Sequence, residues 1–359
     1  MWTTRQISLQ QWLLGFIAVG IALFILVAGR FFLVPLAIAI LLFSLISAAI
    51  ARISRLRIGS FEMPDWLASL VVLIGIGLIL LMLSGIMANQ INVLIASAPV
   101  YWTGIQRLIA DLSQWVGGDV AAGIFALVGE IDLVGYLRPL AGSAGYIAGT
   151  TILIILYVGF LLAERGQFTH KLGRIFANPE QTDEIERMFE SIVRNVHRYI
   201  LIKSLVSALT GALAYVLMRI IGLEFAETWA MLTVFLNFIP NIGSIVATLV
   251  LTLVAFFQFD SWGPVLVVFG VIGAIQFLIG NVVEPAVMGR SLRLSSFVII
   301  LSLTFWGAIW GIVGMFLAVP IMVMIMIVCS HVPALRSVAI LLSREGEPVE
   351  SDKKALPRV

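Results

Sequence analysis

Two short polar stretches interrupt apolar segments of the chain, and they hold the residues best suited to chemistry. The first is Asn-Phe-Ile-Pro-Asn-Ile-Gly-Ser at 237–244, and the second is Asn-Val-Val-Glu-Pro at 281–285. Their amides and hydroxyls are neutral hydrogen-bonding groups, suited to a polyol or a hydrated ion. A carboxylate against an apolar span is costly to bury and is therefore a candidate functional group. The pattern indicates binding of a small polar species.

The first stretch supplies most of the candidate substrate site. We predict that Asn237, Asn241 and Ser244 bind cargo, with Pro240 freeing backbone carbonyls and Gly243 completing the tip. Irregular backbone at membrane depth is tolerated where protein or a wet cavity satisfies it, and transporters hold cargo at such tips. The alternative is that Pro-Asn-Ile-Gly is only a tight turn. The two interpretations are compatible, and a turn alone does not require a polar residue at 237.

In the second stretch, Asn281 and Glu284 are three residues apart and share one face of a helix. Gln276 precedes Asn281 by five residues, so a shared face is less certain for it. Pro285 is expected to end the helix. Glu284 can change charge, which makes it the candidate ion-coupling residue for H+ or Na+. The alternative is a boundary carboxylate paired with Arg290.

A third stretch, rich in glycine, lies near the C-terminus. Gly311, Gly314 and Pro320 complete the candidate substrate site, and the glycines permit close approach of helices. Trp306 and Trp310 could stack on cargo, but packing or interfacial anchoring is the favoured interpretation.

The sequence lacks the residue sets that enzymes and metal proteins need. It has no nucleophile elbow, phosphate-binding loop, H-E-x-x-H sequence or Cys/His cluster. His170, His197 and His331 show no metal-ligand spacing, and the single Cys329 excludes an intramolecular disulfide. We therefore expect a protein that is not an enzyme, without catalytic residues, bound metal or cofactor apart from a coupling ion. The driving force would be an ion gradient or the cargo's own gradient.

The composition indicates an integral membrane protein. Hydrophobic residues make up 61% of the 359 residues and charged residues only 12%, whereas soluble domains carry about 25% charge. A net charge of +2 is too small to imply a nucleic-acid partner. The first apolar run follows a single Arg5, lacks a clear cleavage site and is followed directly by another, so we expect a retained helix and not a signal peptide.

Six apolar segments have the length of full spans. They are 12–28, 31–51, 66–88, 146–163, 204–221 and 263–283. Arg52, Arg55 and Arg57 follow the second segment, and basic loops stay cytoplasmic, so both termini are expected inside and 89–145 outside. Asn178-Pro179 predicts the start of an amphipathic helix on the inner membrane surface. A nucleotide- or protein-docking role for that helix is the alternative.

Two further apolar runs, 229–257 and 297–330, are too long for one ordinary span. The first would measure about 43 Å as a straight helix, against a hydrocarbon core of about 30 Å. Both runs could be re-entrant helical hairpins, or both could cross fully to give eight spans. Arg290 and Arg293 favour the hairpins, which place them in the cytoplasm. The hairpins would then form an inverted repeat, entering from opposite sides.

The sequence thus predicts an all-α polytopic membrane protein. Its parts would be a three-span scaffold at 1–88, which also supplies the oligomer contact, and an external amphipathic segment at 89–145. A span with a cytoplasmic amphipathic helix at 146–203, a transport unit at 204–335 and a cytoplasmic, partly disordered tail at 336–359 would follow.

Three motifs together resemble the autoinducer-2 exporter (AI-2E) family of PerM-like permeases. They are Phe-Ile-Pro-Asn-Ile-Gly at 238–243, Asn-Val-Val-Glu-Pro-Ala-Val-Met-Gly at 281–289, and Phe-Trp-Gly-Ala-Ile-Trp-Gly-Ile-Val-Gly at 305–314, followed by Leu-Ala-Val-Pro. The resemblance runs over nearly the whole chain, to about residue 335. It implies a multi-pass protein of the bacterial inner membrane that forms homo-oligomers, with pentamers known in the family. It also implies efflux of small molecules, including the quorum-sensing signal autoinducer-2, whereas other members look like sodium–proton antiporters.

The leading expectation is therefore a transporter that exports small polar molecules such as autoinducer-2 across the lipid bilayer. A sodium–proton antiporter with Glu284 as the ion-binding carboxylate is the first alternative. A passive channel or a structural membrane assembly is the second.

Overall fold

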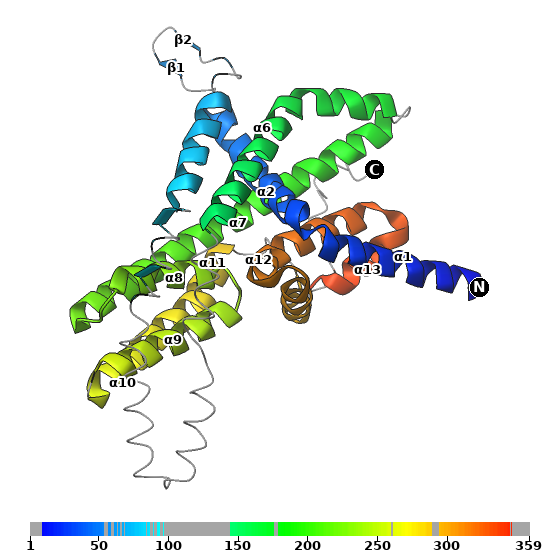
Figure 1. The fold of residues 1–359 in the computed structure, drawn as a ribbon. Helices are drawn as coiled ribbons and strands as arrows, with labels where there is room; N and C mark the ends of the chain where they lie inside the picture. The colour runs from blue at the N-terminus through cyan, green and yellow to red at the C-terminus, as the bar shows by residue number, and fades with distance from the viewer. Residues whose placement is uncertain are drawn as a thin grey trace, which may run out of the picture.

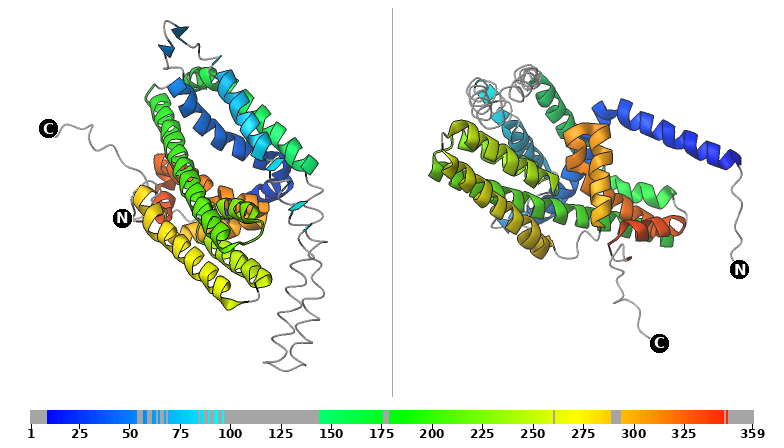
Figure 2. Two further views of the ribbon diagram at one scale, coloured as in Figure 1. Left: turned by 90° about the vertical axis from the view of Figure 1, so that its left-hand side faces the viewer. Right: turned by 90° about the horizontal axis from the view of Figure 1, so that it is seen from below.

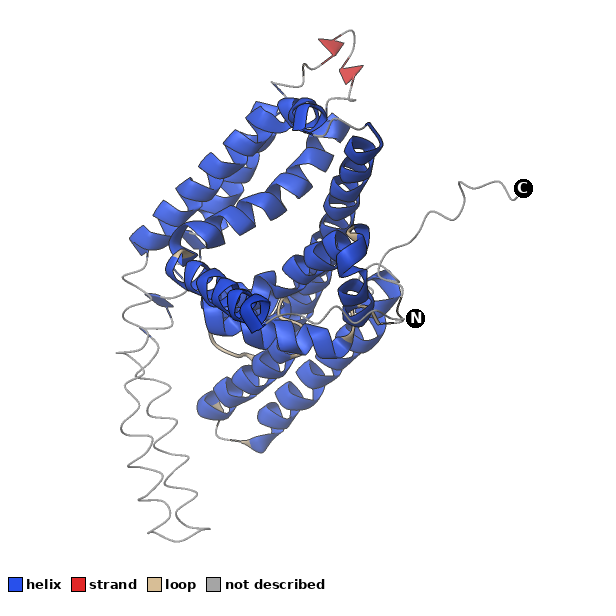
Figure 3. Ribbon diagram, turned by 90° about the vertical axis from the view of Figure 1, so that its right-hand side faces the viewer, coloured by secondary structure: helices blue, strands red, loops and turns tan. Residues whose placement is uncertain are grey.

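The computed structural model of the chain is helical, as the sequence predicts (Figures 1 and 3). It describes residues 9–53, 57–58, 61–62, 64, 67, 69–83, 85–86, 89, 92–93, 96, 144–175, 179–259, 261–288, 294–344 and 346. In these ranges the strands are β1 (Arg57–Ile58) and β2 (Phe61–Glu62), a short antiparallel pair. The predicted external segment 89–145 lies almost wholly outside the described residues.

Two apolar helices open the described chain. α1 (Leu9–Ala28) and α2 (Arg30–Ile53) meet at Gly29, where the sequence predicts a break, and they are bent by 85°. The apolar side chains of α1 are exposed, and the helix projects from the body (Figure 2). α2 instead packs with the helix Ser69–Leu83 and with α6 (Ala144–Ile175) around Ala39, Ile46 and Val158. These three helices form one layer of the molecule.

The described residues hold several helices that could cross a membrane, as predicted, and the count of six full spans stays a prediction. Four helical segments there are long and apolar enough to cross a membrane, and the bent pair α1–α2 would make a fifth. The segments are Ala148–Gln167, Gln181–Ile221, Trp262–Met288 and Ser296–His331. The described part of the predicted third span, Ser69–Leu83, is a shorter apolar helix.

α7 (Pro179–Ile221) is a single helix of 43 residues against which several other helices pack. It begins at Pro179, as predicted, and runs without a break through residue 203, where the sequence analysis separates a surface helix from a span. Residues of its buried face recur at helical spacing, and they contact α2, α8, α10 and α12. They include Val196, Tyr199, Lys203, Ser207 and Thr210.

The run 229–257 forms a helical hairpin, split where the sequence predicts. α8 (Ala226–Asn237) ends before Pro240, and α9 (Ile242–Gln258) returns along it. Asn241 begins the return with φ 61° and ψ −54°, the conformation of the central residue of a classic γ-turn, which is rare and strained. A Cβ on Gly243 would lie 1.7 Å from the Leu236 carbonyl oxygen, so this position requires glycine. α10 (Trp262–Leu278) packs on α9 and completes a bundle with the end of α7.

The run 297–330 also folds back on itself, within α12 (Ser296–His331). The reversal occurs at Gly311, whose φ of 65° and ψ of −145° are non-helical. A Cβ on Gly314 would lie 1.9 Å from the Trp306 carbonyl oxygen, so the two arms are in backbone contact (Figure 2). Pro320 was also expected to interrupt the run, and that prediction is wrong, because Pro320 is buried inside the helical second arm.

The two hairpins contact each other at their tips. The rings of Phe238 and Phe316 stack with centroids 4.5 Å apart. Ile239, 5% exposed, packs with Trp306 and Ala318 of α12. Movement of one hairpin would therefore shift the packed residues of the other hairpin directly.

The predicted C-terminal tail begins with helical structure. η2 (Pro333–Leu335) and α13 (Arg336–Leu342) continue the helical chain, with Ala339 fully buried. The backbone N–H of Ser295 donates to the carbonyl of Leu342 over 3.0 Å, which ties α13 to the start of α12. The expected tail 336–359 therefore begins with a helix, in which Ala339 is buried whereas Val338, Ile340 and Leu341 are exposed.

Gly243→Ala and Gly314→Ala should each open a hairpin, because the new methyl group would overlap a backbone carbonyl of the opposite arm. Overpacking costs about 1–3 kcal/mol where side chains can yield, and backbone yields less. Thermal unfolding of the purified protein in detergent would measure the loss. Gly270→Ala on α10 is the control, because a Cβ there meets nothing within 4 Å. Equal melting temperatures for all three variants would contradict this packing.

Candidate functional site

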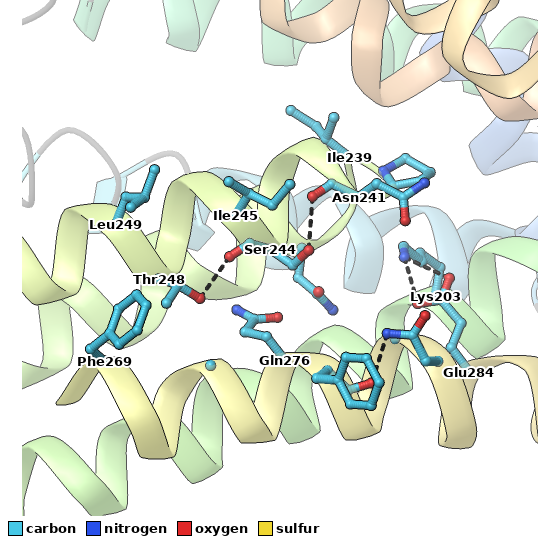
Figure 4. A pocket seen from close by; sticks show the side chains of 16 residues that line it. Lys203, Ile239, Asn241, Ser244, Ile245, Thr248, Leu249, Phe269, Gln276 and Glu284 are labelled. Atoms are coloured by element: carbon cyan, nitrogen blue, oxygen red, sulfur yellow. Dashed lines mark hydrogen bonds and ion pairs between the residues drawn. The ribbon is translucent and has the colours of Figure 1, made fainter. Parts of the chain in front are cut away.

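A cavity of about 430 Å³ lies between α9 and α10, at the tip of the first hairpin (Figure 4). The residues that line it combine polar and apolar side chains from α7, the first hairpin and the segment from α10 to Glu284. They are Lys203, Asn237, Ile239, Pro240, Asn241, Ser244, Ile245, Thr248, Leu249, Phe269, Gly273, Gln276, Phe277, Gly280, Asn281 and Glu284. The volume is in the range of small-molecule sites.

The strongest interaction in the cavity joins Lys203 of α7 to Glu284. The Lys203 ammonium donates to both carboxylate oxygens, over 2.6 and 2.9 Å. The Lys203 side chain is 2% exposed and that of Glu284 is 18% exposed. Because a buried ammonium without a partner would be very unfavourable, Glu284 is required to compensate its charge.

Sequence reasoning missed Lys203 by grouping it with the basic residues of a cytoplasmic loop. The signal was its spacing: Lys203 continues the apolar stripe of the amphipathic helix after Val196 and Ile200. A charged residue on such a stripe predicts a buried partner. The expected alternative partner of Glu284, Arg290, lies outside the described residues.

Glu284 is positioned by an irregular turn of the helix. The π-helix η1 (Ile279–Val283) joins α10 to α11 (Glu284–Met288). Pro285 was expected to end the helix, and that prediction is wrong. Proline lacks the N–H that would bind the Asn281 carbonyl four residues earlier, and the chain absorbs the loss by widening into a π turn. π turns of this kind occur often at functional sites.

Gln276, at the end of α10 just before the π turn, lines the same cavity as Asn281 and Glu284. A π-helix relates residues five apart, which is the spacing from Gln276 to Asn281. The Asn281 side-chain amide donates to the Phe277 carbonyl over 3.0 Å.

The first hairpin places Asn237, Asn241 and Ser244 in the cavity lining, and their binding of cargo stays a prediction. The amide of Asn237, 6% exposed, donates to the hydroxyls of Ser207 and Thr210 on α7 over 3.2 and 3.4 Å. Asn237 therefore ties α8 to α7 as well as lining the cavity. The Ser244 hydroxyl donates to the Asn241 carbonyl over 2.8 Å, and its lone pairs stay available to a ligand.

The expectation of carbonyls freed by Pro240 is wrong for the one most affected. The Leu236 carbonyl, four residues before Pro240, accepts the N–H of Ile239 over 2.9 Å. The Pro240 carbonyl accepts the N–H of Ile242 over 2.7 Å. The tip therefore offers side chains, more than backbone, to a ligand.

The other predicted site residues lie apart from the cavity wall. Gly243 lies behind it, at the contact between the hairpin arms. Gly311, Gly314 and Pro320 belong to the second hairpin and do not line this cavity. Trp306 is 7% exposed and Trp310 donates its indole N–H to the Leu26 carbonyl of α1 over 2.9 Å, so both tryptophans pack.

Chemically, the cavity offers neutral donors and acceptors beside a charge pair that neutralises itself. Within the described residues no group of three or more His, Cys, Asp or Glu side chains could hold a metal ion. The lining therefore combines neutral hydrogen-bonding groups with one carboxylate, Glu284, which is paired with Lys203.

Comparison with known proteins gives a consistent picture. The model of the AI-2E family of transporters matches residues 14–334. A putative transport protein of Haemophilus influenzae is 29% identical, over 94% of this chain and 97% of its own length. The AI-2 transport protein TqsA of Escherichia coli is 30% identical, over 91% and 94% respectively. The putative permease PerM of Escherichia coli is 27% identical, over 82% and 85%.

Glu284→Gln should destabilise the protein by about 3–5 kcal/mol, because it leaves the Lys203 ammonium buried without a counter-charge. The double variant Lys203→Met with Glu284→Gln should recover most of this loss. Thermal unfolding in detergent measures both. Glu227→Gln is the matched control, because Glu227 and Arg219 are exposed and 3.9 Å apart, and such pairs contribute little. Equal stability of Glu284→Gln and the control would show that the buried pair is not a structural link.

Proposed function

The chain belongs to the AI-2E family of transporters, and from this premise we propose that it exports small polar molecules such as autoinducer-2. The observation that carries the proposal is the cavity beside the first hairpin, where Asn241, Ser244, Gln276 and Asn281 present neutral hydrogen-bonding groups. The relative named as an AI-2 transport protein supports the choice of cargo.

We further propose that the two hairpins move as opposed halves of an inverted repeat. In this proposal both are re-entrant, α7 with α8–α9 corresponds to α10 with α12, and the cavity opens to each side in turn. Two observations support it. Each hairpin is closed by a glycine against a carbonyl of the opposite arm, and the tips are in contact through Phe238 and Phe316.

A sodium–proton antiporter is the second candidate, and the buried pair favours it. A cation that binds Glu284 must compete with Lys203, so binding of Na+ or H+ would release α7 from the π turn. A passive channel or a structural membrane assembly is the third candidate. A passive channel would pass cargo without saturation.

The proposal places the protein in the bacterial inner membrane as a multi-pass protein with both termini in the cytoplasm. It acts without a cofactor and is not an enzyme. It functions as a homo-oligomer, for which a pentamer is the family precedent, and the exposed apolar residues of α1 would then meet lipid or a neighbouring copy.

Asn241→Ala combined with Ser244→Ala should reduce saturable transport of autoinducer-2 several-fold, because each lost hydrogen bond is worth about 0.5–1.5 kcal/mol. Transport is measured in vesicles that contain the purified protein. Thr252→Val, which removes a hydroxyl of α9 outside the cavity lining, should transport normally. Unchanged transport in the double variant would exclude this site.

Lys203→Gln combined with Glu284→Gln should abolish uphill movement of cargo while downhill exchange continues, because the pair keeps its size but can no longer change charge. Vesicles with an imposed proton or sodium gradient separate the two activities. If the double variant still concentrates cargo against its gradient, Glu284 is not the coupling residue.

Ser291→Cys should resist an impermeant thiol reagent added to intact cells, because the hairpin topology places this loop in the cytoplasm. Ser291 lies outside the described residues, so the test is independent of the structure. Cells made permeable supply the control, in which labelling should appear. Ready labelling of intact cells would favour eight spans.

A further inference from the structure

Gln276 is the unusual residue of the cavity. Its side chain is 6% exposed, and neither atom of its amide has a hydrogen-bond partner among the described residues. Figure 4 shows it in the middle of the cavity, between Thr248 and the Lys203–Glu284 pair. A buried amide normally has its hydrogen bonds satisfied. A ligand that supplied the missing hydrogen bonds of Gln276 would therefore gain binding free energy.

The neighbouring polar side chains are already engaged. Thr248 donates to the Ser244 carbonyl over 2.9 Å, and Asn281 and Asn237 donate as described above. The remaining amide, Asn241, is exposed and has access to water. Gln276 is therefore the buried amide of the lining whose donor and acceptor are both without a partner in the described part of the chain.

The charges of the cavity specify the charge of the ligand. Lys203 and Glu284 are the charged residues of the lining, and they pair with each other in a bidentate contact. A ligand with a net charge would find no free counter-charge without breaking that buried pair, which is unfavourable. An uncharged ligand meets only neutral donors and acceptors.

The cavity also changes character along its length. The charge pair lies at one end and Leu249 and Phe269 lie at the other, with Gln276 between them (Figure 4). A compact molecule with adjacent polar groups and one apolar end matches this order.

We propose that Gln276 is a specificity-determining residue that binds an uncharged cargo through both atoms of its amide. The cargo presents an adjacent donor and acceptor, as a vicinal diol or a hydroxyl beside a carbonyl does. This inference rests on the proposed export function and names the substrate class of the same cavity.

The experiment measures uptake of autoinducer-2 into inside-out vesicles of phosphatidylethanolamine and phosphatidylglycerol that contain the full chain. Erythritol and its carboxylate analogue erythronate serve as competitors. Erythritol should compete and erythronate should not. Gln276→Leu should raise the half-saturating concentration about ten-fold, as expected for two lost hydrogen bonds, with a maximal rate within about two-fold of the original. Thr252→Val should change neither value.

The melting temperature distinguishes a role of Gln276 in cargo binding from a role in stabilising the fold. Leucine removes an unpartnered buried amide, so Gln276→Leu should melt at the same temperature or higher. If Gln276→Leu fails to assemble, Gln276→Asn replaces it and should raise the half-saturating concentration about three-fold, because the shorter amide reaches fewer partners.

The failures are distinguishable. An unchanged half-saturating concentration in either variant, a lower melting temperature with unchanged uptake, or stronger competition by erythronate than by erythritol would overturn the role of Gln276. The absence of saturable uptake in the unaltered protein would overturn the proposed function, and this inference with it.

Discussion

The arrangement of the C-terminal half depends on the ion pair between Lys203 and Glu284. A lysine that is 2% exposed can remain charged only if a carboxylate reaches it, and Glu284 reaches it because the π turn before Pro285 turns the carboxylate toward α7. The pair therefore fixes α11 against the middle of α7. Gln276 of α10 and Asn281 of η1 precede it and line the cavity together with the hairpin tip.

The hairpins impose a second constraint, which is steric. In each of them a glycine lies against the carbonyl of a residue on the opposite arm, Gly243 on Leu236 and Gly314 on Trp306. Such contacts leave no room for a side chain, so each hairpin is a rigid unit with its tip at a fixed place. The tips meet through Phe238 and Phe316, which makes the first hairpin and α12 mechanically connected. A transporter that moves cargo past the first tip would have to move both.

Membership of the AI-2E family gives the general activity, transport across a membrane, and the cavity holds the polar groups that the proposed transport uses. The residues there belong to two classes with different tasks. Lys203, Glu284 and Asn237 join helices to one another, whereas the Gln276 amide makes no hydrogen bond within the described residues and Asn241 is exposed to solvent. A cavity in which the structural charges are paired and the free groups are neutral suits an uncharged cargo.

The sequence by itself determined the helical class, the break at Gly29 and the hairpin at Pro240-Asn241. It also identified four polar residues that line the cavity: Asn241, Ser244, Asn281 and Glu284. These features follow from local rules: hydrophobic length, the special conformations of glycine, proline and asparagine, and the cost of polar groups in apolar segments. Only the tertiary structure decided that Glu284 pairs with Lys203 and that Gln276 joins its face. The ion pair joins residues 81 positions apart, and the segment between Gln276 and Glu284 contains a π turn. Neither a long-range contact nor an irregular helical turn can be derived from the local spacing of residues.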